Sequence, residues 1–344
     1  MDKPTARGYL PIDGIAAYDA AVKGLVFGAD SDVVKSGRVA TVQAIGGTGG
    51  LKIGADFLKK LSPNATVLIS DPSWENHRAL FTNAGFNVDT YPYFDQSANG
   101  GLGGINFDGM LAKLNAAAEG TIVLLHACCH NPTGYDITPA QWDQVIAVVK
   151  ARNLTAFLDM AYQGFGYGIA EDGAVIGKFV AAGLNIFVST SFSKSFSLYG
   201  ERVGALSVVG SSKEETDRVL SQLKIAIRTN YSNPPTHGGA IVAAVLGNPE
   251  LRALWEKELG EMRVRIKAMR QKLVDGLKAA GVTKDMSFIT TQIGMFSYSG
   301  LSKDQMVRLR SEFGVYGTDT GRMCVAALNS KNIDYVCQAI AKVV

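Results

Sequence analysis

One segment decides how this chain is interpreted: Ser191-Phe192-Ser193-Lys194-Ser195-Phe196-Ser197-Leu198-Tyr199-Gly200-Glu201-Arg202-Val203-Gly204. It follows an apolar, strand-like stretch at residues 185–189. A lysine at the end of a buried strand, flanked by hydroxyl groups and followed by an arginine, is placed to hold a carbonyl cofactor as an imine with a phosphate group beside it. In isolation the same pattern also fits a surface lysine in a serine-rich loop. The remaining motifs decide between these two interpretations.

Length, charge and cysteine content limit the class of protein. The 344 residues exceed the usual size of a single core, which predicts two lobes. Lys+Arg total 34 against 31 Asp+Glu without a charged block, which favours a small-molecule substrate over nucleic acid or membrane. With no apolar run of about 18 residues and no signal-peptide core, we expect a cytoplasmic protein. No disulfide or zinc spacing links the cysteines, so we expect no metal and four buried thiols, Cys128, Cys129, Cys324 and Cys337.

Apolar strand-like runs alternate with helical patterns along most of the chain. This alternation predicts an α/β fold with a mostly parallel sheet covered by helices on both faces. Ligands of such sheets bind beyond the carboxyl ends of the strands. The expected strands are 39–45, 66–69, 121–129, 156–160, 186–189 and 203–209, and the expected helices are 49–61, 74–84, one opened by Thr138 and Pro139, and 174–182.

A long charged segment at residues 248–281 has helical periodicity and predicts a helix that leaves the first lobe. We therefore divide the chain into a large domain, 1–260, and a small α+β domain, 261–344. The small domain is expected to contain a strand at 295–299, a helix capped by Ser302 with Gln305 three residues on, a strand-like stretch near 315–326, and a last helix from residue 333.

Three further motifs stand at predicted strand ends. Gly46-Gly47-Thr48-Gly49-Gly50 opens a helix, where backbone N–H groups bind phosphate, although the motif also fits a tight turn. Asn131-Pro132-Thr133-Gly134 is equally typical of ordinary turn structure. Asp159 ends an apolar strand, and a carboxylate there is costly unless it meets a cation such as a protonated ring nitrogen.

In this order, a phosphate loop, an asparagine turn, a strand-end aspartate and a lysine with a downstream arginine resemble the fold type I pyridoxal-phosphate enzymes. The chain is most similar to the class I aspartate and aromatic-amino-acid (tyrosine) aminotransferase family, along essentially its whole length. Besides the lysine segment, the matching motifs are Ser70-Asp71-Pro72-Ser73-Trp74-Glu75-Asn76-His77, His126-Ala127-Cys128-Cys129-His130-Asn131-Pro132-Thr133-Gly134, Ala161-Tyr162-Gln163-Gly164-Phe165, Arg228-Thr229-Asn230-Tyr231-Ser232-Asn233-Pro234-Pro235 and Gly321-Arg322-Met323-Cys324-Val325.

The resemblance implies pyridoxal 5'-phosphate as the cofactor and assigns its ring contacts. Lys194 would carry the cofactor as an imine and shuttle a proton at the substrate carbon, for which its pKa must fall below the free value near ~10.4. We expect the cofactor charge and the arginines to lower it. Asp159 would pair with the ring nitrogen, and Asn131 and Tyr162 would bind the ring oxygen. The other matched ring contacts are Trp74, His77 behind Asp159 and His126, each of which also fits a packed core residue.

The phosphate and substrate contacts follow from the same resemblance. Gly47, Thr48, Ser191 and Arg202 match phosphate ligands. Arg322 matches the residue that binds the substrate α-carboxylate through a planar fork. Tyr9 and Arg228 match residues donated across a subunit interface, to the phosphate and to a distal carboxylate respectively. The resemblance therefore implies a homodimer with two shared sites.

The sequences of several motifs resemble the bacterial aromatic-amino-acid aminotransferases more than the aspartate enzymes. Arg228, which would bind the distal carboxylate of an acidic substrate, is nevertheless present. We therefore expect ping-pong transfer between an aromatic or acidic L-amino acid and 2-oxoglutarate. Aspartate as the main substrate, another fold type I reaction such as decarboxylation or β-elimination, and an inactive member remain alternatives. Relatives begin well before the position of Tyr9, which predicts weaker cofactor binding and dimerisation for the chain as written.

Overall fold

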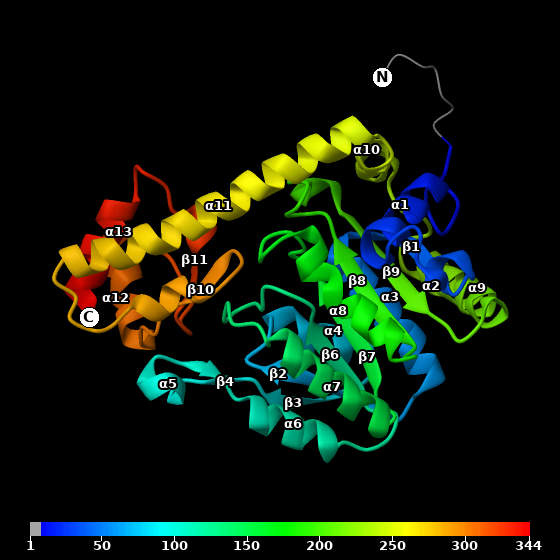
Figure 1. The fold of residues 1–344 in the computed structure, drawn as a ribbon, viewed down its shortest axis with the longest axis horizontal. Helices are drawn as coiled ribbons and strands as arrows, with labels where there is room; N and C mark the ends of the chain where they lie inside the picture. The colour runs from blue at the N-terminus through cyan, green and yellow to red at the C-terminus, as the bar shows by residue number, and fades with distance from the viewer. Residues whose placement is uncertain (1–7) are drawn as a thin grey trace.

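The computed structural model describes residues 8–344 and is built around a seven-stranded sheet (Figure 1). Its strand order is β1-β9-β8-β7-β6-β2-β3. Pairing is parallel from β8 across to β3, whereas β9 runs antiparallel to both of its neighbours. The expectation of a mostly parallel sheet is thus confirmed. The strands are β1 Val39–Ile45, β2 Thr66–Asp71, β3 Asn87–Pro92, β6 Ile122–His126, β7 Thr155–Met160, β8 Ile186–Ser191 and β9 Val203–Val209.

Helices cover both faces of this sheet, because side chains alternate in direction along each strand and most strands are apolar on both sides. One face packs on α3 (Gly46–Leu61), α4 (Glu75–Asn83) and α9 (Lys213–Asn230). The other packs on α1 (Ala16–Phe27), α6 (Phe107–Asn115), α7 (Pro139–Ala151) and α8 (Ile169–Ala181). The two resulting cores hold the strand ends rigidly in place.

Local sequence signals predicted several element boundaries. The side chains of Thr138 and Gln141 close the expected capping box at the start of α7, and Ser302 and Gln305 do the same for α12, Lys303–Phe313. Other boundaries differ: α3 begins at Gly46 rather than 49, and α8 at Ile169 rather than 174. Of the stretch 315–326 only Arg322–Cys324 forms strand β11, because Gly321 adopts a positive φ of 87° in a turn.

The C-terminal third is joined to the rest by one long helix, α11, Pro249–Ala279 (Figure 1). It leads from α10 (Thr236–Leu246) to the two-stranded sheet of β10 (Phe296–Tyr298) and β11, to α12, and to α13, Ile333–Val343. The boundary between residues 260 and 261 falls inside α11, so the division into two domains stays a prediction. The remaining elements are short: α2 Asp32–Lys35, β4 Phe94–Asp95, α5 Ala98–Gly101 and β5 Gly104–Ile105. Within residues 8–344, no helix has the length and apolar character needed to cross a membrane.

Candidate active site

A pocket of about 370 Å³ opens where β6, β7 and β8 end. Residues far apart in the sequence meet there because parallel strands bring their carboxyl ends to one edge of the sheet. Eleven of the residues singled out from the sequence line it: Gly47, Thr48, Trp74, His126, Asn131, Asp159, Tyr162, Ser191, Lys194, Arg202 and Arg322. The structure therefore brings the ring, phosphate and α-carboxylate candidates into one cavity.

Lys194 lies just beyond β8 in a turn that points its side chain into the pocket. Its Nζ is 4.8 Å from the centre of the Tyr162 ring. Burial lowers the pKa of Lys194, and the positive charge of Arg202 adds to that effect, while Asp159 opposes it. We expected the cofactor and the arginines to lower the pKa; in this chain burial is the largest cause. A lysine with a lowered pKa is a better nucleophile and base at neutral pH.

Asp159 is the penultimate residue of β7, and its side chain is buried. Oδ2 lies 2.8 Å from Nε2 of His77, which is also buried. Burial is the largest single influence and would raise the pKa of the Asp159 carboxyl, but the hydrogen bond with His77 and the electrostatic interactions with His77, His126 and Lys194 together outweigh it, so the pKa is lowered. Asp159 therefore stays ionised, and a cation above it would satisfy the buried charge.

A hydrogen-bonded chain extends behind Asp159. Nδ1 of His77 lies 2.9 Å from Oγ of Ser73, and the same hydroxyl lies 3.3 Å from Nε2 of His126. Burial and the nearby His77 lower the pKa of His126 to about 3, so its ring is neutral. His77 does not line the pocket. Its hydrogen bond orients the Asp159 carboxylate, and its ring packs against Trp74 and His126, which do line the pocket.

The glycine loop forms a cradle at the start of α3. A Cβ added at Gly46, where φ is 78°, would lie 2.4 Å from Nη2 of Arg202, and one added at Gly47 would lie 3.0 Å from Cβ of Ser191. The loop thus lets backbone N–H groups, a hydroxyl and a guanidinium approach one point. That donor set, at the positive end of a helix, suits a phosphate group.

Arg322 reaches the pocket from β11. Its Nη1 donates a hydrogen bond of 2.9 Å to Oδ1 of Asn131, and its guanidinium carbon lies 4.8 Å from the centre of the Phe296 ring. Oε1 of Glu75 lies 3.6 Å from the same nitrogen. The guanidinium is therefore held at the mouth of the pocket, with donors left to bind a carboxylate.

Tyr9 and Arg228 do not enter the pocket of their own chain. The Tyr9 side chain is 94% exposed. Arg228 lies in the last turn of α9, where its Nη1 donates to Oγ of Ser232. The geometry of one chain therefore leaves both residues available to a neighbour, and their assigned roles stay predictions.

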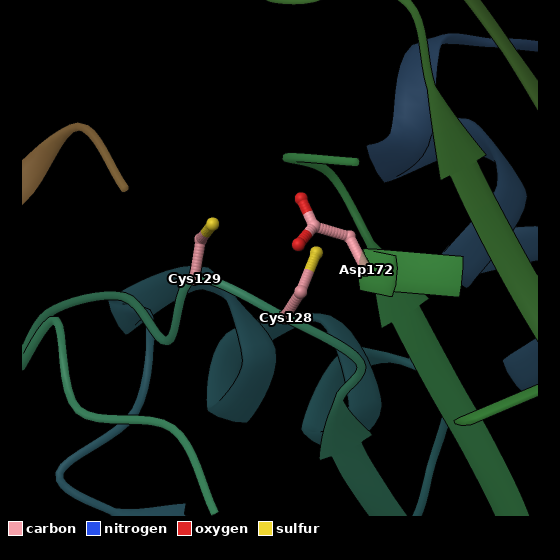
Figure 2. Close-up of side chains that lie close together, drawn as sticks. All are labelled: Cys128, Cys129 and Asp172. Atoms are coloured by element: carbon pink, nitrogen blue, oxygen red, sulfur yellow. The ribbon is translucent and has the colours of Figure 1, made fainter. Parts of the chain in front are cut away.

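Two adjacent thiols, Cys128 and Cys129, lie close to Asp172 (Figure 2), and Cys128 also lines the pocket. Sγ of Cys128, Sγ of Cys129 and a carboxylate oxygen of Asp172 lie within 4.8 Å of one another. The Asp172 carboxylate accepts hydrogen bonds from the backbone N–H groups of Gly164, Gly166 and Tyr167. The hydrogen bond with Cys129 lowers the pKa of Cys128, but burial and the nearby carboxylates raise it to about 11. Because metals bind thiolates, this cluster fits a pair of neutral core thiols better than a metal site.

Sequence reasoning missed several parts of the pocket. Cys128, Ser193 and Tyr199 line it and belong to motifs quoted for other residues, while Phe296 lies in a strand predicted only as structure. Two features of the sequence could have identified these residues: a position at the end of a strand and proximity to Lys194 along the chain. The expectation of four buried thiols is wrong for Cys324, which is exposed two residues after Arg322. Side chains two apart on a strand share a face, so Cys324 follows Arg322 to the open side of β11.

Comparison with known proteins identifies the family of this chain. Residues 1–340 match the model of the family "aminotransferase class I and II". An aspartate aminotransferase of Pseudomonas aeruginosa PAO1 is 60% identical over 98% of this chain and 84% of its own length. An aromatic-amino-acid aminotransferase of Escherichia coli K12 is 53% identical over 97% of this chain and 83% of its own length. This protein therefore belongs to the class I and II aminotransferases.

Solved structures agree with that family. The crystal structure of an aromatic-amino-acid aminotransferase from Burkholderia pseudomallei, covalently bound to pyridoxal phosphate, superposes with a TM-score of 0.96. It is 67% identical and covers 99% of this chain and 84% of its own. The resemblance predicted from the motifs is confirmed, together with the fold type and pyridoxal phosphate as the family's cofactor. The residues of the pocket fit pyridoxal phosphate, because a phosphate cradle, a buried carboxylate and a lysine surround a cavity of about 370 Å³.

Proposed function

We propose that this protein transfers an amino group between an aromatic or acidic L-amino acid and 2-oxoglutarate, using pyridoxal phosphate held in the pocket of Lys194. One observation carries the proposal: Lys194 lies between a buried carboxylate, Asp159, and two arginines, Arg202 and Arg322, that face into the same cavity. When bound, pyridoxal phosphate supplies a reactive carbonyl carbon and an electron-accepting ring.

Different residues of the pocket would hold different parts of the cofactor. Arg202, Ser191, Thr48 and the N–H groups of the glycine loop bind its phosphate. Asp159, oriented by His77, would hold a proton on the ring nitrogen. Asn131 and Tyr162 would donate hydrogen bonds to the ring oxygen, and Trp74 would pack against the ring.

Lys194 is the base at the reacting carbon. Its lowered pKa leaves a larger neutral fraction of Nζ at neutral pH, and that nitrogen would take a proton from the substrate α-carbon. Arg322 binds the α-carboxylate and so fixes the carbon within reach of Nζ. These positions favour amino-group exchange over decarboxylation, because the carboxylate is held rather than released.

Both substrate classes have support. The pocket wall contains the aromatic rings of Trp74, Tyr162 and Phe296, which favours an aromatic side chain. Relatives named for aspartate and for aromatic amino acids are similar to this chain at 60% and 53% identity. The proposal is therefore a dual-specificity enzyme, with aspartate as the main substrate kept as the second candidate.

The proposed enzyme is a homodimer with shared sites. The exposure of Tyr9 and the position of Arg228 outside the pocket support donation of both residues to the partner subunit. A reducing compartment such as the cytoplasm is also proposed, supported by four free cysteines, two of them adjacent and buried.

The visible absorption spectrum of the purified protein tests the function. With pyridoxal phosphate added, the wild type should show the band of lysine-bound cofactor, and the Lys194→Ala variant should lack it. L-phenylalanine and, separately, L-aspartate should each convert that band to the near-ultraviolet band of the aminated cofactor, which 2-oxoglutarate reverses. A band that neither amino acid moves would show an inactive member, and a released amine or elimination product would show a different reaction.

A further inference from the structure

Glu75 is the first residue of α4 and directly follows Trp74, which lines the pocket. Its Oε1 lies 3.6 Å from Nη1 of Arg322, while its side chain is 69% exposed. The carboxylate therefore stands at the mouth of the pocket, beside the guanidinium assigned to the substrate α-carboxylate. Phe296 and Asn131 hold the other sides of that guanidinium.

We propose that Glu75 is a specificity-determining residue that disfavours substrates with a second carboxylate. The inference rests on the proposed function, because it concerns how the same site chooses between aromatic and acidic amino acids. Glu75 does not line the pocket itself, so it acts on the choice of substrate rather than on the chemical step.

The argument is one of charge. Every amino-acid substrate brings an α-carboxylate to Arg322, and this group meets the Glu75 carboxylate equally in all cases. An acidic substrate brings one more negative charge into a pocket whose mouth already carries Glu75, whereas an aromatic side chain brings none. Like charges repel even at partial exposure, so the penalty from Glu75 is larger for aspartate than for phenylalanine.

The expected size follows from exposure and screening. The Glu75 side chain is 69% exposed, so solvent and dissolved salt screen its charge, and the interaction with a second carboxylate is weak but measurable at low salt. We expect the ratio of kcat/KM for aspartate to kcat/KM for phenylalanine to rise about two- to fivefold when the charge is removed. Salt should remove most of this difference.

The experiment compares Glu75→Gln with wild type in the holoenzyme. Glutamine keeps the size of the side chain at the first position of α4. Glu250→Gln is the matched control, because Glu250 is an exposed glutamate in the first turn of another helix, α11, and does not line the pocket. Steady-state kinetics with both amino acids are measured at about 0.02 M salt, where charges are weakly screened, and at about 0.5 M salt, where they are strongly screened.

In support, Glu75→Gln raises the aspartate-to-phenylalanine ratio at low salt, mainly through KM, and the rise shrinks at high salt while Glu250→Gln stays at the wild-type ratio. An unchanged ratio at low salt, or a change that salt does not affect, overturns the proposal. Failure of the proposed function is distinguishable, since wild-type protein would then turn over neither amino acid.

Discussion

Nε2 of His77 lies 2.8 Å from Oδ2 of Asp159, and both side chains are buried. Burial alone would raise the pKa of this carboxyl, but the hydrogen bond together with the electrostatic interactions with His77, His126 and Lys194 lowers it, so Asp159 stays ionised. The remaining acceptor capacity of Asp159 faces the pocket. Asp159 thus presents a fixed negative charge to whatever occupies the cavity.

The substitution Asp159→Asn removes that charge and keeps the shape of the side chain. We expect kcat to fall about 10²- to 10³-fold, as for the loss of one aligned electrostatic group in other active sites. His77→Gln, which removes only the orienting ring, should lower kcat far less. Single-turnover rates with L-phenylalanine check both values, and equal losses in the two variants would contradict the assigned division of roles.

The substitution Arg322→Lys keeps the charge at the mouth of the pocket but removes the planar fork. Loss of a bidentate contact to the α-carboxylate should lower kcat/KM about 10- to 100-fold for phenylalanine and aspartate alike. Arg308→Lys, an exposed arginine of α12 paired with Glu312, is the control and should behave as wild type. A loss confined to aspartate would place the distal carboxylate, not the α-carboxylate, on Arg322.

Mixing two inactive variants tests the shared sites. In a hybrid of a Lys194→Ala chain with an Arg228→Ala chain, one site combines the intact Lys194 of one subunit with the intact Arg228 of the other. We expect aspartate turnover to reappear after the chains are unfolded and refolded together, up to half of the sites in each hybrid. If Arg228 serves its own chain, the mixture gains nothing, because no single chain holds both residues.

Asp19 predicts a pH dependence of stability. It lies in α1 with 8% of its surface exposed, and within the described part of the chain its Oδ1 has no hydrogen-bond partner. Burial, with the nearby Asp13, raises the pKa of Asp19 from 3.8 to about 8. Between these values the folded state keeps a proton that the unfolded state releases, so the stability contributed by this group falls as pH rises.

The Asp19→Asn variant should therefore gain on wild type as pH rises from 4 to 8 and show no further change above that range. Urea unfolding of both proteins across this range, with cofactor present, measures the difference in free energy of unfolding. Asp30→Asn, at a side chain that is 96% exposed, should track wild type. A constant offset between wild type and Asp19→Asn at all pH values would contradict the titration.

Much of the architecture around the seven-stranded sheet could be predicted, because its strands carry unbroken apolar runs and its helices carry explicit start signals. β1 and β9 have the predicted bounds, 39–45 and 203–209. The antiparallel direction of β9 could not be predicted, since a buried strand has the same pattern whichever way it runs. The strand predicted near 315–326 was too long, because a turn at Gly321 precedes β11, which is only Arg322–Cys324.

In the candidate site, too, some residues could be predicted from the sequence and others could not. Asp159, at the end of β7, could be predicted because topology brings strand ends together, whereas Asn131, in the turn five residues after β6, was assigned only through the family resemblance. Phe296 was missed because its contact with Arg322 arises between segments whose packing no local pattern encodes. Arg270 belonged to a helix described as charged, yet it is only 2% exposed and donates to the carbonyl groups of Ile289, Gly294 and Phe296. A periodic pattern cannot separate a buried arginine from a solvated one.

α11 is one continuous helix, so a change in its angle displaces the residues farther along it. Its 31 residues give a length of about 46 Å at 1.5 Å per residue. Near one end, Nε1 of Trp255 donates to the carbonyl of Ser195, the residue after Lys194. β11 with Arg322 lies beside the middle of this helix (Figure 1), where Arg265 donates to the carbonyl groups of Ala326 and Leu328 just after the strand. Arg265 follows Trp255 by about 15 Å along the helix, so a tilt of about 5° about Trp255 displaces this contact by about 1.3 Å and changes the separation of lysine and guanidinium.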